Sequence, residues 1–210
     1  MSTPAPRWDL TNVYPSLESK EFIAAIDGFK VQVTDLEDYF EEVVSKTDEN
    51  TPADQLGPIV GDVVDRFNAA YTLSSTIEPF IYSFVSTDSR EKTAMRTLSE
   101  YEQISLPMQN LEVQLKAWLG AVAPTLDASL EHSASAKAHA FMLKEAADQS
   151  KFLMSKPEEA LAAELSLSGG NAWGKLQGTV TSQLSVDFEL DGESQKLPMP
   201  ALINLRSHPD

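Results

Sequence analysis

Three histidines, His132, His139 and His208, are the side chains of this 210-residue chain that are best suited to bind a metal ion. A catalytic zinc helix carries two histidines four residues apart and a glutamate beside the first, so that the ligands and the general base lie together. His132 and His139 are instead seven residues apart, with Glu131 before the first. This spacing would place both imidazoles on one face of a helix, but the chain offers them no third ligand. The histidines therefore predict no metal site.

The other candidates for chemistry fit structural roles better. No serine stands in a Gly-x-Ser-x-Gly turn, where a serine nucleophile is often found, and the chain has no cysteine. Ser168-Gly169-Gly170-Asn171 has the small residues of a phosphate loop but lacks the Lys-Ser/Thr ending, so a helix boundary explains it better. Glu158 and Glu159 suit the first turn of a helix, where the helix dipole favours carboxylates. We therefore predict no catalytic, cofactor-binding or metal-binding residue in this chain.

The composition argues against several kinds of partner. The formal net charge is -16, and the isoelectric point is about 4.5. Nucleic-acid-binding proteins need a basic face, and anionic membranes repel acidic proteins, so we expect neither nucleic acid nor membrane as a partner. The N-terminal residues lack the apolar segment of a secretory signal, and no apolar run approaches the roughly 20 residues that cross a bilayer. With the lack of cysteine, these features predict a cytoplasmic protein.

The apolar spacing predicts three long helices, at residues 19–46, 52–85 and 88–121. In the first, apolar residues recur alternately every four and three positions, which is typical of a helix that packs on a partner helix. They are Phe22, Ile26, Phe29, Val33, Leu36, Phe40 and Val43. Thr51-Pro52 is a candidate cap for the second helix, and Asp88-Ser89-Arg90-Glu91 has the spacing of a capping box for the third. We expect Pro79 to kink or break the second helix and Pro107 to kink the third.

Shorter elements follow the long helices. Short helices are predicted at residues 126–131, 135–154 and 158–165, with a second capping box from Ser155 to Glu158. After a break at Ser168-Gly169-Gly170, we expect a helix that buries Trp173, Leu176 and Val180 on one side. The apolar period then changes to two from Leu184 to Leu190, and Asp191-Gly192 indicates a hairpin turn. A return strand is expected at residues 193–197 and the first turns of a helix at 201–205.

The predicted fold is therefore mainly α: an elongated bundle of long antiparallel helices with one small β-hairpin near the C-terminus. Residues 1–123 would form an N-terminal arm and the long-helix bundle, and residues 124–210 the shorter helices and the hairpin. This arrangement of helices and strands does not by itself indicate any enzymatic activity.

Residues 161–186 carry a more specific signal. The run AEL-x-x-SGG-x-AW-x-x-L, followed by TSQLSVDF, resembles the N-terminal region of the oligoendopeptidase F family, which are cytosolic zinc endopeptidases related to thimet oligopeptidase. Three further passages agree: RWDLTNVYPSLES near the start, YSFVSTDSREKTA between two long helices, and LPMPALINLRSHPD at residues 197–210. The order and spacing of these passages extend the resemblance over essentially the whole chain.

The resemblance implies the N-terminal helical lobe of a metalloendopeptidase that hydrolyses short peptides. The zinc-binding His-Glu-x-x-His helix of the family lies beyond residue 210, so no catalytic residue of the family can be carried over to this sequence. Zinc, the peptide substrates and a C-terminal catalytic domain would then belong to a full-length enzyme. The helices here would form part of its substrate-channel wall, and the chain alone would be inactive. The alternative is a stand-alone helical binding or scaffold module.

Overall fold

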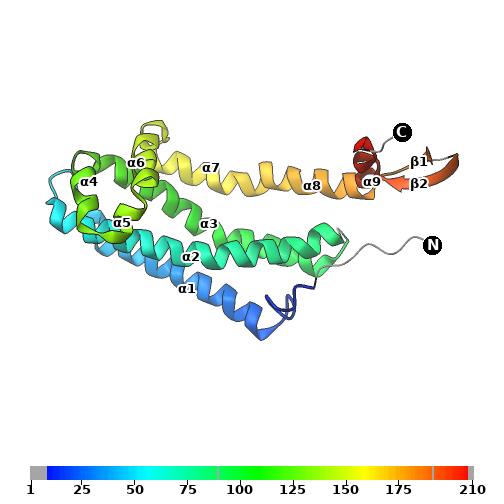
Figure 1. The fold of residues 1–210 in the computed structure, drawn as a ribbon, viewed down its shortest axis with the longest axis horizontal. Coiled ribbons are helices and arrows are strands. Elements are labelled where there is room, and N and C mark those ends of the chain that lie inside the picture. The colour runs from blue at the N-terminus through cyan, green and yellow to red at the C-terminus, as the bar shows by residue number, and fades with distance from the viewer. Residues whose placement is uncertain (1–8, 89, 191, 208–210) are drawn as a thin grey trace. The chain divides into compact units, whose positions relative to one another are not determined.

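The computed structural model describes residues 9–88, 90–190 and 192–207, which form two compact units. The first unit comprises Met1–Ala160 and the second Leu161–Asp210 (Figure 1). These compact units meet after Ala160, whereas the sequence analysis placed a domain boundary after residue 123. The domain boundary itself stays a prediction. Trp8, the tryptophan of the passage RWDLTNVYPSLES, and His208 lie outside the described residues. The described residues are mainly helical and form one hairpin near the C-terminus, as predicted.

Three long antiparallel helices form the body of the first unit (Figure 1). They are α1 (Lys20–Glu42), α2 (Ala53–Thr87) and α3 (Lys92–Ala121), with a 3-10 turn, η1 (Val44–Lys46), after the first. The hydroxyl of Ser19 caps α1 by accepting the backbone N–H of Phe22 at 3.2 Å. The three long helices predicted from apolar spacing are therefore present.

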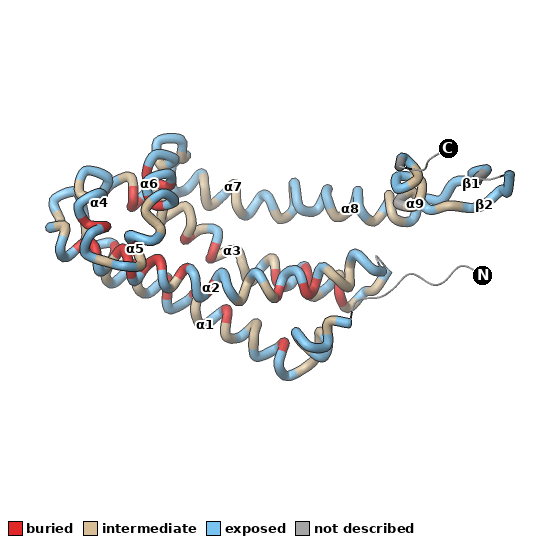
Figure 2. Tube along the Cα trace, in the orientation of Figure 1, coloured by how far each residue is buried: buried red, intermediate tan, exposed pale blue. Residues whose placement is uncertain are grey.

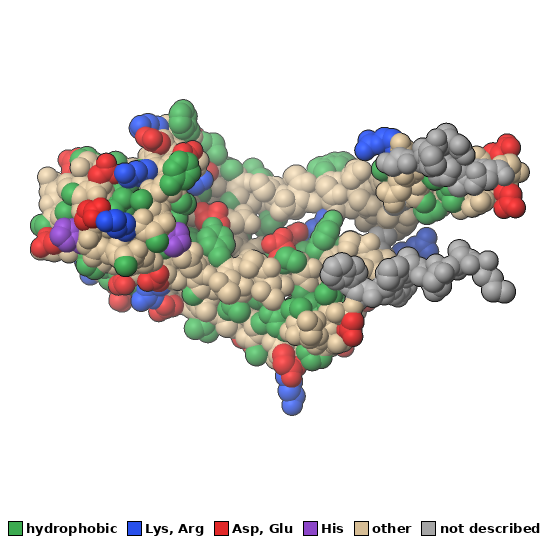
Figure 3. Space-filling view, viewed as in Figure 1, with side chains coloured by type: hydrophobic (Ala, Val, Ile, Leu, Met, Phe, Trp, Pro, Cys, Tyr) green, Lys and Arg blue, Asp and Glu red, His purple; other side chains and the backbone are tan. Residues whose placement is uncertain are grey.

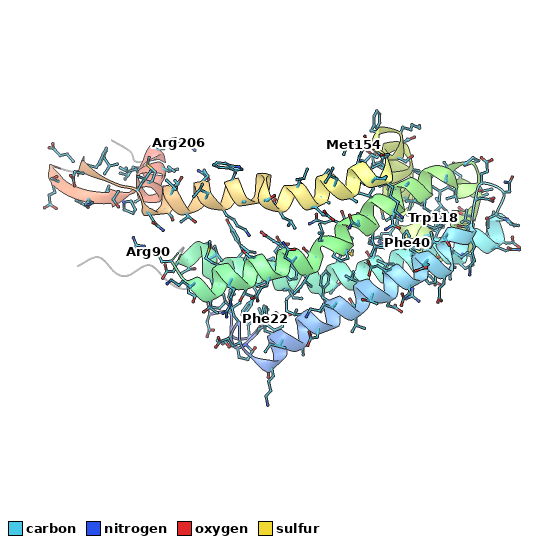
Figure 4. All side chains as sticks on the ribbon, turned by 180° about the vertical axis from the view of Figure 1, so that it is seen from behind. Phe22, Phe40, Arg90, Trp118, Met154 and Arg206 are labelled. Atoms are coloured by element: carbon cyan, nitrogen blue, oxygen red, sulfur yellow. The ribbon has the colours of Figure 1, made fainter. Side chains whose placement is uncertain are left out.

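Their apolar stripes form the core of the first unit (Figure 2). Five of the seven apolar positions predicted for α1 are buried: Phe22, Phe29, Val33, Leu36 and Phe40. Figure 4 shows Phe40 and Trp118 at the same end of the bundle, where their ring centroids are 6.3 Å apart. The indole N–H of Trp118 donates to the hydroxyl of Thr47 at 2.7 Å, so the polar group of this buried ring is satisfied.

Shorter helices pack on α2 and α3 within the same unit. They are α4 (Ala123–Ser129), η2 (Leu130–His132), α5 (Ala134–Ala138), α6 (Ala140–Gln149) and η3 (Ser150–Phe152). The single helix predicted for residues 135–154 is wrong, because the chain turns at His139 and starts a new helix there. Pairing of the His139 backbone N–H with the carbonyl oxygens of Ser135 and Ala136 ends α5.

Two of the predicted helix caps are wrong. Pro52, not Thr51, precedes α2, and the Thr51 hydroxyl instead accepts the backbone N–H of Asp48 at 2.9 Å. Asp88 ends α2 rather than starting α3, because its N–H still pairs with the Phe84 carbonyl oxygen. Glu91 caps α3 through its carboxylate, which accepts the N–H groups of Thr93 and Ala94. Ser89 lies outside the described residues.

The prolines inside the long helices do not interrupt them. Pro58 and Pro79 lie within α2, and Pro107 lies within α3. The predicted break before Pro79 is therefore not found, whereas the other predicted outcome, a kink there, stays a prediction. A proline removes one backbone hydrogen bond, whereas the flanking turns of α2 bury residues such as Ile77 and Phe80 on the core, which keeps the helix whole.

The second unit contains a helix pair and a hairpin. Helix α7 (Lys156–Ser168) crosses the boundary between the units and is followed by α8 (Gly170–Gln183). Strand β1 (Ser185–Leu190) pairs antiparallel with β2 (Glu193–Pro198), with Val186 opposite Leu197 and Phe188 opposite Gln195. Gly192 has a φ of 78°, as a tight hairpin turn requires, and α9 (Met199–Asn204) with η4 (Leu205–Ser207) follows. Asp191, the other residue of the predicted turn, lies outside the described residues.

Candidate docking surface

The two described histidines do not form a metal site. His132 ends η2 and is exposed, whereas His139 lies between α5 and α6. The prediction that their spacing places them on one helix face is therefore wrong, because Ser133 is extended and separates the two elements. Nδ1 of His139 lies 2.9 Å from the Ser135 carbonyl oxygen, and Nε2 lies 3.4 Å from the Asn68 amide nitrogen. Figure 3 shows the purple side chains apart from each other.

Metal-binding carboxylates are also missing from the part of the chain that the structure describes. No group of three or more His, Cys, Asp or Glu side chains there could hold a metal ion. The donor set of a zinc peptidase is thus not found among these residues, and no chemical step can be assigned to zinc bound here. That the complete chain binds no metal stays a prediction.

The acidic pair Glu158-Glu159 serves helix α7, as its position in the sequence indicates. The Glu158 carboxylate accepts the backbone N–H of Ser155 at 2.9 Å and also the Ser155 hydroxyl, which lowers the pKa of Glu158 below its usual value. Glu159 accepts the backbone N–H of Met154 at 2.9 Å. Both carboxylates are engaged at a helix start, so they do not form an acid–base pair.

Ser168-Gly169-Gly170 is a helix boundary, as predicted. Helix α7 ends at Ser168, and Gly169 is the N-cap of α8 with φ -93° and ψ -108°. A β-carbon on Gly169 would lie only 2.8 Å from the Leu165 carbonyl oxygen, which also accepts the Gly169 N–H. The glycine is therefore needed so that α8 can begin directly after α7.

An apolar face on α7 and α8 lies exposed. Trp173 is 70 % exposed, and Leu165 is 58 % exposed. Five large apolar residues of α7 and α8 are exposed in this way, at intervals of four, eight, three and four residues: Leu161, Leu165, Trp173, Leu176 and Val180. We call these five residues the α7–α8 face. The prediction that Trp173, Leu176 and Val180 are buried is wrong, because no other described element of the second unit covers them.

The apolar character continues into the hairpin. Leu184, Val186 and Phe188 alternate with polar residues as predicted, but all three are exposed. Ile203 of α9 is exposed as well. No described side chain of the second unit is buried, in contrast to the first unit (Figure 2). Figure 3 shows hydrophobic side chains at the surface over α8. Contiguous exposed apolar surface of this kind marks an interaction site in a stable protein.

Three glycines of α8 also lie next to open space. Gly170, Gly174 and Gly178 recur every fourth position, and a β-carbon at any of them would meet nothing within 4 Å. Glycine inside a helix destabilises it by about 1 kcal/mol relative to alanine. No contact within the described structure explains these three glycines.

The polar groups of the first unit form structural networks. The Tyr39 hydroxyl donates to the Asp62 carboxylate at 3.1 Å, and the guanidinium carbon of Arg66 lies 4.4 Å from the centre of the Tyr39 ring. Burial, and then the charge and hydrogen bond of Asp62, raise the pKa of Tyr39 to about 12. Arg66 also pairs with Asp35. This cluster joins α1 to α2.

A cavity of about 740 Å³ lies between the N-terminal arm and the end of α2. Its apolar wall includes Leu10, Tyr14, Phe80 and Phe84. The Tyr14 ring meets that of Phe80 edge-on, with centroids 5.0 Å apart. The described part of the arm, from Asp9 onward, thus lies on the helical body.

Comparison with known families gives one match. Residues 122–185 match the N-terminal family model described as Oligopeptidase F. The resemblance to the oligoendopeptidase F family is thus confirmed for this segment. The match covers 64 of the 210 residues, from the start of α4 to the start of β1. No curated protein and no solved structure matches the chain.

The match contains the whole α7–α8 face. Apolar spacing in the sequence placed Trp173, Leu176 and Val180 on one side of a helix, but it could not reveal that this side is uncovered. No described helix is long and apolar enough to cross a membrane.

Proposed function

We propose that the chain is the non-catalytic N-terminal helical lobe of a zinc-dependent oligoendopeptidase that hydrolyses short peptides. The α7–α8 face would dock on the catalytic domain, which holds the zinc, and the helices of the lobe would form part of the substrate-channel wall. The observation that carries this proposal is the coincidence of the uncovered apolar face with the segment that matches oligopeptidase F.

The energetics of burial support a docking role. Covering apolar surface contributes roughly 25 cal/mol per Å², so one fully buried Trp or Leu side chain contributes about 2 kcal/mol. Five such residues on two successive helices form a surface that water solvates poorly and a packed partner would stabilise.

Extension of the polypeptide tests the proposal. The chain alone should not cleave an internally quenched peptide. A polypeptide that continues with the residues encoded downstream should cleave it, lose activity with a chelator and regain it with zinc. A coding sequence that stops after Asp210, without a separate polypeptide carrying His-Glu-x-x-His, would contradict the proposal.

Substitutions on α8 test the docking step in the extended polypeptide. Trp173→Ala with Leu176→Ala should lower its melting temperature by several degrees and reduce activity, because both side chains leave the interface. Asn171→Ala is the matched control, because it lies nine residues before Val180 and thus on the opposite side of α8. Equal effects of the two changes would argue against docking through the α7–α8 face.

A stand-alone helical binding or scaffold module is the second candidate. The closed core of the first unit favours it, because the long helices bury their own stripes without any partner. This function predicts a well-folded chain that binds hydrophobic dyes weakly. Strong dye binding together with aggregation of the isolated chain would favour the peptidase lobe instead.

A further inference from the structure

A second cavity lies among three helices of the first unit. Its volume is about 220 Å³, and its walls come from α2, α3 and α6. Val64, Phe67, Leu115 and Ala146 supply an apolar lining, and Met142 of α6 also contributes. All these residues belong to one compact unit, so the cavity is formed without any contribution from residues 161–210.

Lys116 is an unpaired cation in the wall of this cavity. It is half-buried, and it makes no hydrogen bond or ion pair with any residue that the structure describes. In a chain with a net charge of -16, many carboxylates could pair with a lysine, so a half-buried lysine without such a partner is unusual. The acidic residue nearest to Lys116 in the sequence is Glu112, one helical turn earlier on α3, and its carboxylate accepts a hydrogen bond from Tyr71.

Glu112 supplies a negative charge in the same cavity. Its carboxylate accepts the Tyr71 hydroxyl at 2.7 Å. Burial, followed by this hydrogen bond, raises the pKa of Tyr71, so the phenol stays a donor. The bond occupies one oxygen of Glu112 and fixes the carboxylate between α2 and α3. The second carboxylate oxygen has no partner among the bonds formed by described residues.

The volume limits what the cavity can hold. A cavity of about 150 Å³ accepts benzene, whereas drug-sized ligands need roughly 300 Å³ or more. At about 220 Å³ this cavity suits a single branched aliphatic or aromatic side chain with a small polar head. The polar head would meet an ammonium at Lys116 and a carboxylate at Glu112, one turn apart on α3.

We propose that this cavity binds an apolar α-carboxylate, either a free apolar amino acid or the C-terminal residue of a short peptide. The ligand carboxylate pairs with Lys116, and the side chain lies on Val64, Phe67 and Leu115. The α-amino or amide nitrogen of the ligand donates to Glu112. This proposal rests on the cavity alone and holds whether or not the chain is a peptidase lobe.

Methyl NMR of the whole chain tests the proposal. Met142 lines the cavity, whereas Met95 and Met154 do not, so a chain labelled at the methionine methyl groups contains both a reporter and internal references. Titration with L-leucine or N-acetyl-L-leucine should shift the Met142 signal alone. L-Leucinamide and N-acetyl-L-leucinamide, which lack the carboxylate, should each bind roughly tenfold more weakly or worse than the corresponding acid.

The same titrations distinguish the two sources of the ligand. Tighter binding of L-leucine assigns the cavity to free amino acids, because only they present an ammonium to Glu112. Tighter binding of N-acetyl-L-leucine assigns it to peptide C-termini. No Met142 shift with either ligand, or equal binding of an amide and its corresponding acid, would overturn the proposal.

Charge variants complete the test. Lys116→Met should weaken binding of N-acetyl-L-leucine roughly tenfold, because the carboxylate loses its partner while the apolar stem remains. Lys92→Met is the matched control, since Lys92 is an exposed residue of the same helix and does not line the cavity. Unchanged affinity in Lys116→Met, with unaltered melting temperature, would also overturn the proposal.

Discussion

Gly57 shows how closely α2 approaches the segment that follows α4. A β-carbon on Gly57 would overlap the carbonyl oxygen of Ser129 and lie 2.6 Å from the β-carbon of His132. Both neighbours belong to a packed backbone segment that cannot move aside freely. We therefore expect Gly57→Ala to lower the free energy of unfolding by about 1–3 kcal/mol, measured by urea denaturation.

Gly28→Ala is the matched control for Gly57→Ala. Its added β-carbon would meet only a methyl carbon of Leu73, at an ordinary 3.7 Å. Because Gly28 lies inside α1, alanine there should be neutral or should stabilise the chain by up to about 1 kcal/mol. Equal losses of stability in the two variants would show that crowding at Gly57 is not the cause.

At the scale of elements, helix α3 begins three residues later than the capping box in the sequence predicted. The structure assigns the cap to Glu91, whose carboxylate accepts two backbone N–H groups at the start of α3. Among the residues that the structure describes, the Asp88 side chain accepts the N–H of Arg90, at 2.9 Å, in the turn between the helices. Glu91→Ala should therefore destabilise the chain by about 1 kcal/mol, and Asp88→Ala by less. Thermal unfolding of both variants tests this order, and a larger effect of Asp88→Ala would restore the predicted capping box.

Sequence periodicity predicted the long helices because the stripe of each helix is a local property. Phe22, Phe29 and Phe40 could be assigned to the core for this reason, and all three are buried. The caps could not be predicted with the same success, because Asp88 and Glu91 both have side chains that can accept an N–H group and only the path of the chain decides between them. The turn at His139 was missed because short helices can carry one apolar stripe across a break.

The burial of Trp173 was predicted wrongly for a different physical reason. The apolar spacing of α8 gives the face of the helix that avoids water, but it does not give the element that covers this face. The small cavity was missed because its residues come from three helices and span positions 64 to 146. In the sequence, Lys116 has no feature that distinguishes it from a surface lysine. The prediction that the chain has no catalytic residues came from the lack of known sequence motifs, and the fold alone does not test it.

At the scale of the whole molecule, the two units differ in what holds them together. The first unit has a continuous core, including Phe29, Leu36, Leu56 and Leu111, and each of these side chains is almost fully buried. The described side chains of the second unit are all at least partly exposed. Its helices and hairpin are therefore supported mainly by backbone hydrogen bonds, which stabilise short isolated elements only marginally in water.

This difference predicts how amide hydrogens exchange in the isolated chain. Amides in the middle of α1, α2 and α3 should exchange only through cooperative unfolding, whereas those of α8 and the hairpin should exchange at least a hundredfold faster, through local opening. Hydrogen–deuterium exchange read by mass spectrometry measures both units in one sample, so the first unit serves as the internal control. Slow exchange throughout residues 170–198 would contradict the prediction. If a catalytic domain covers the α7–α8 face, the extended polypeptide should protect these residues while exchange in α1 stays unchanged.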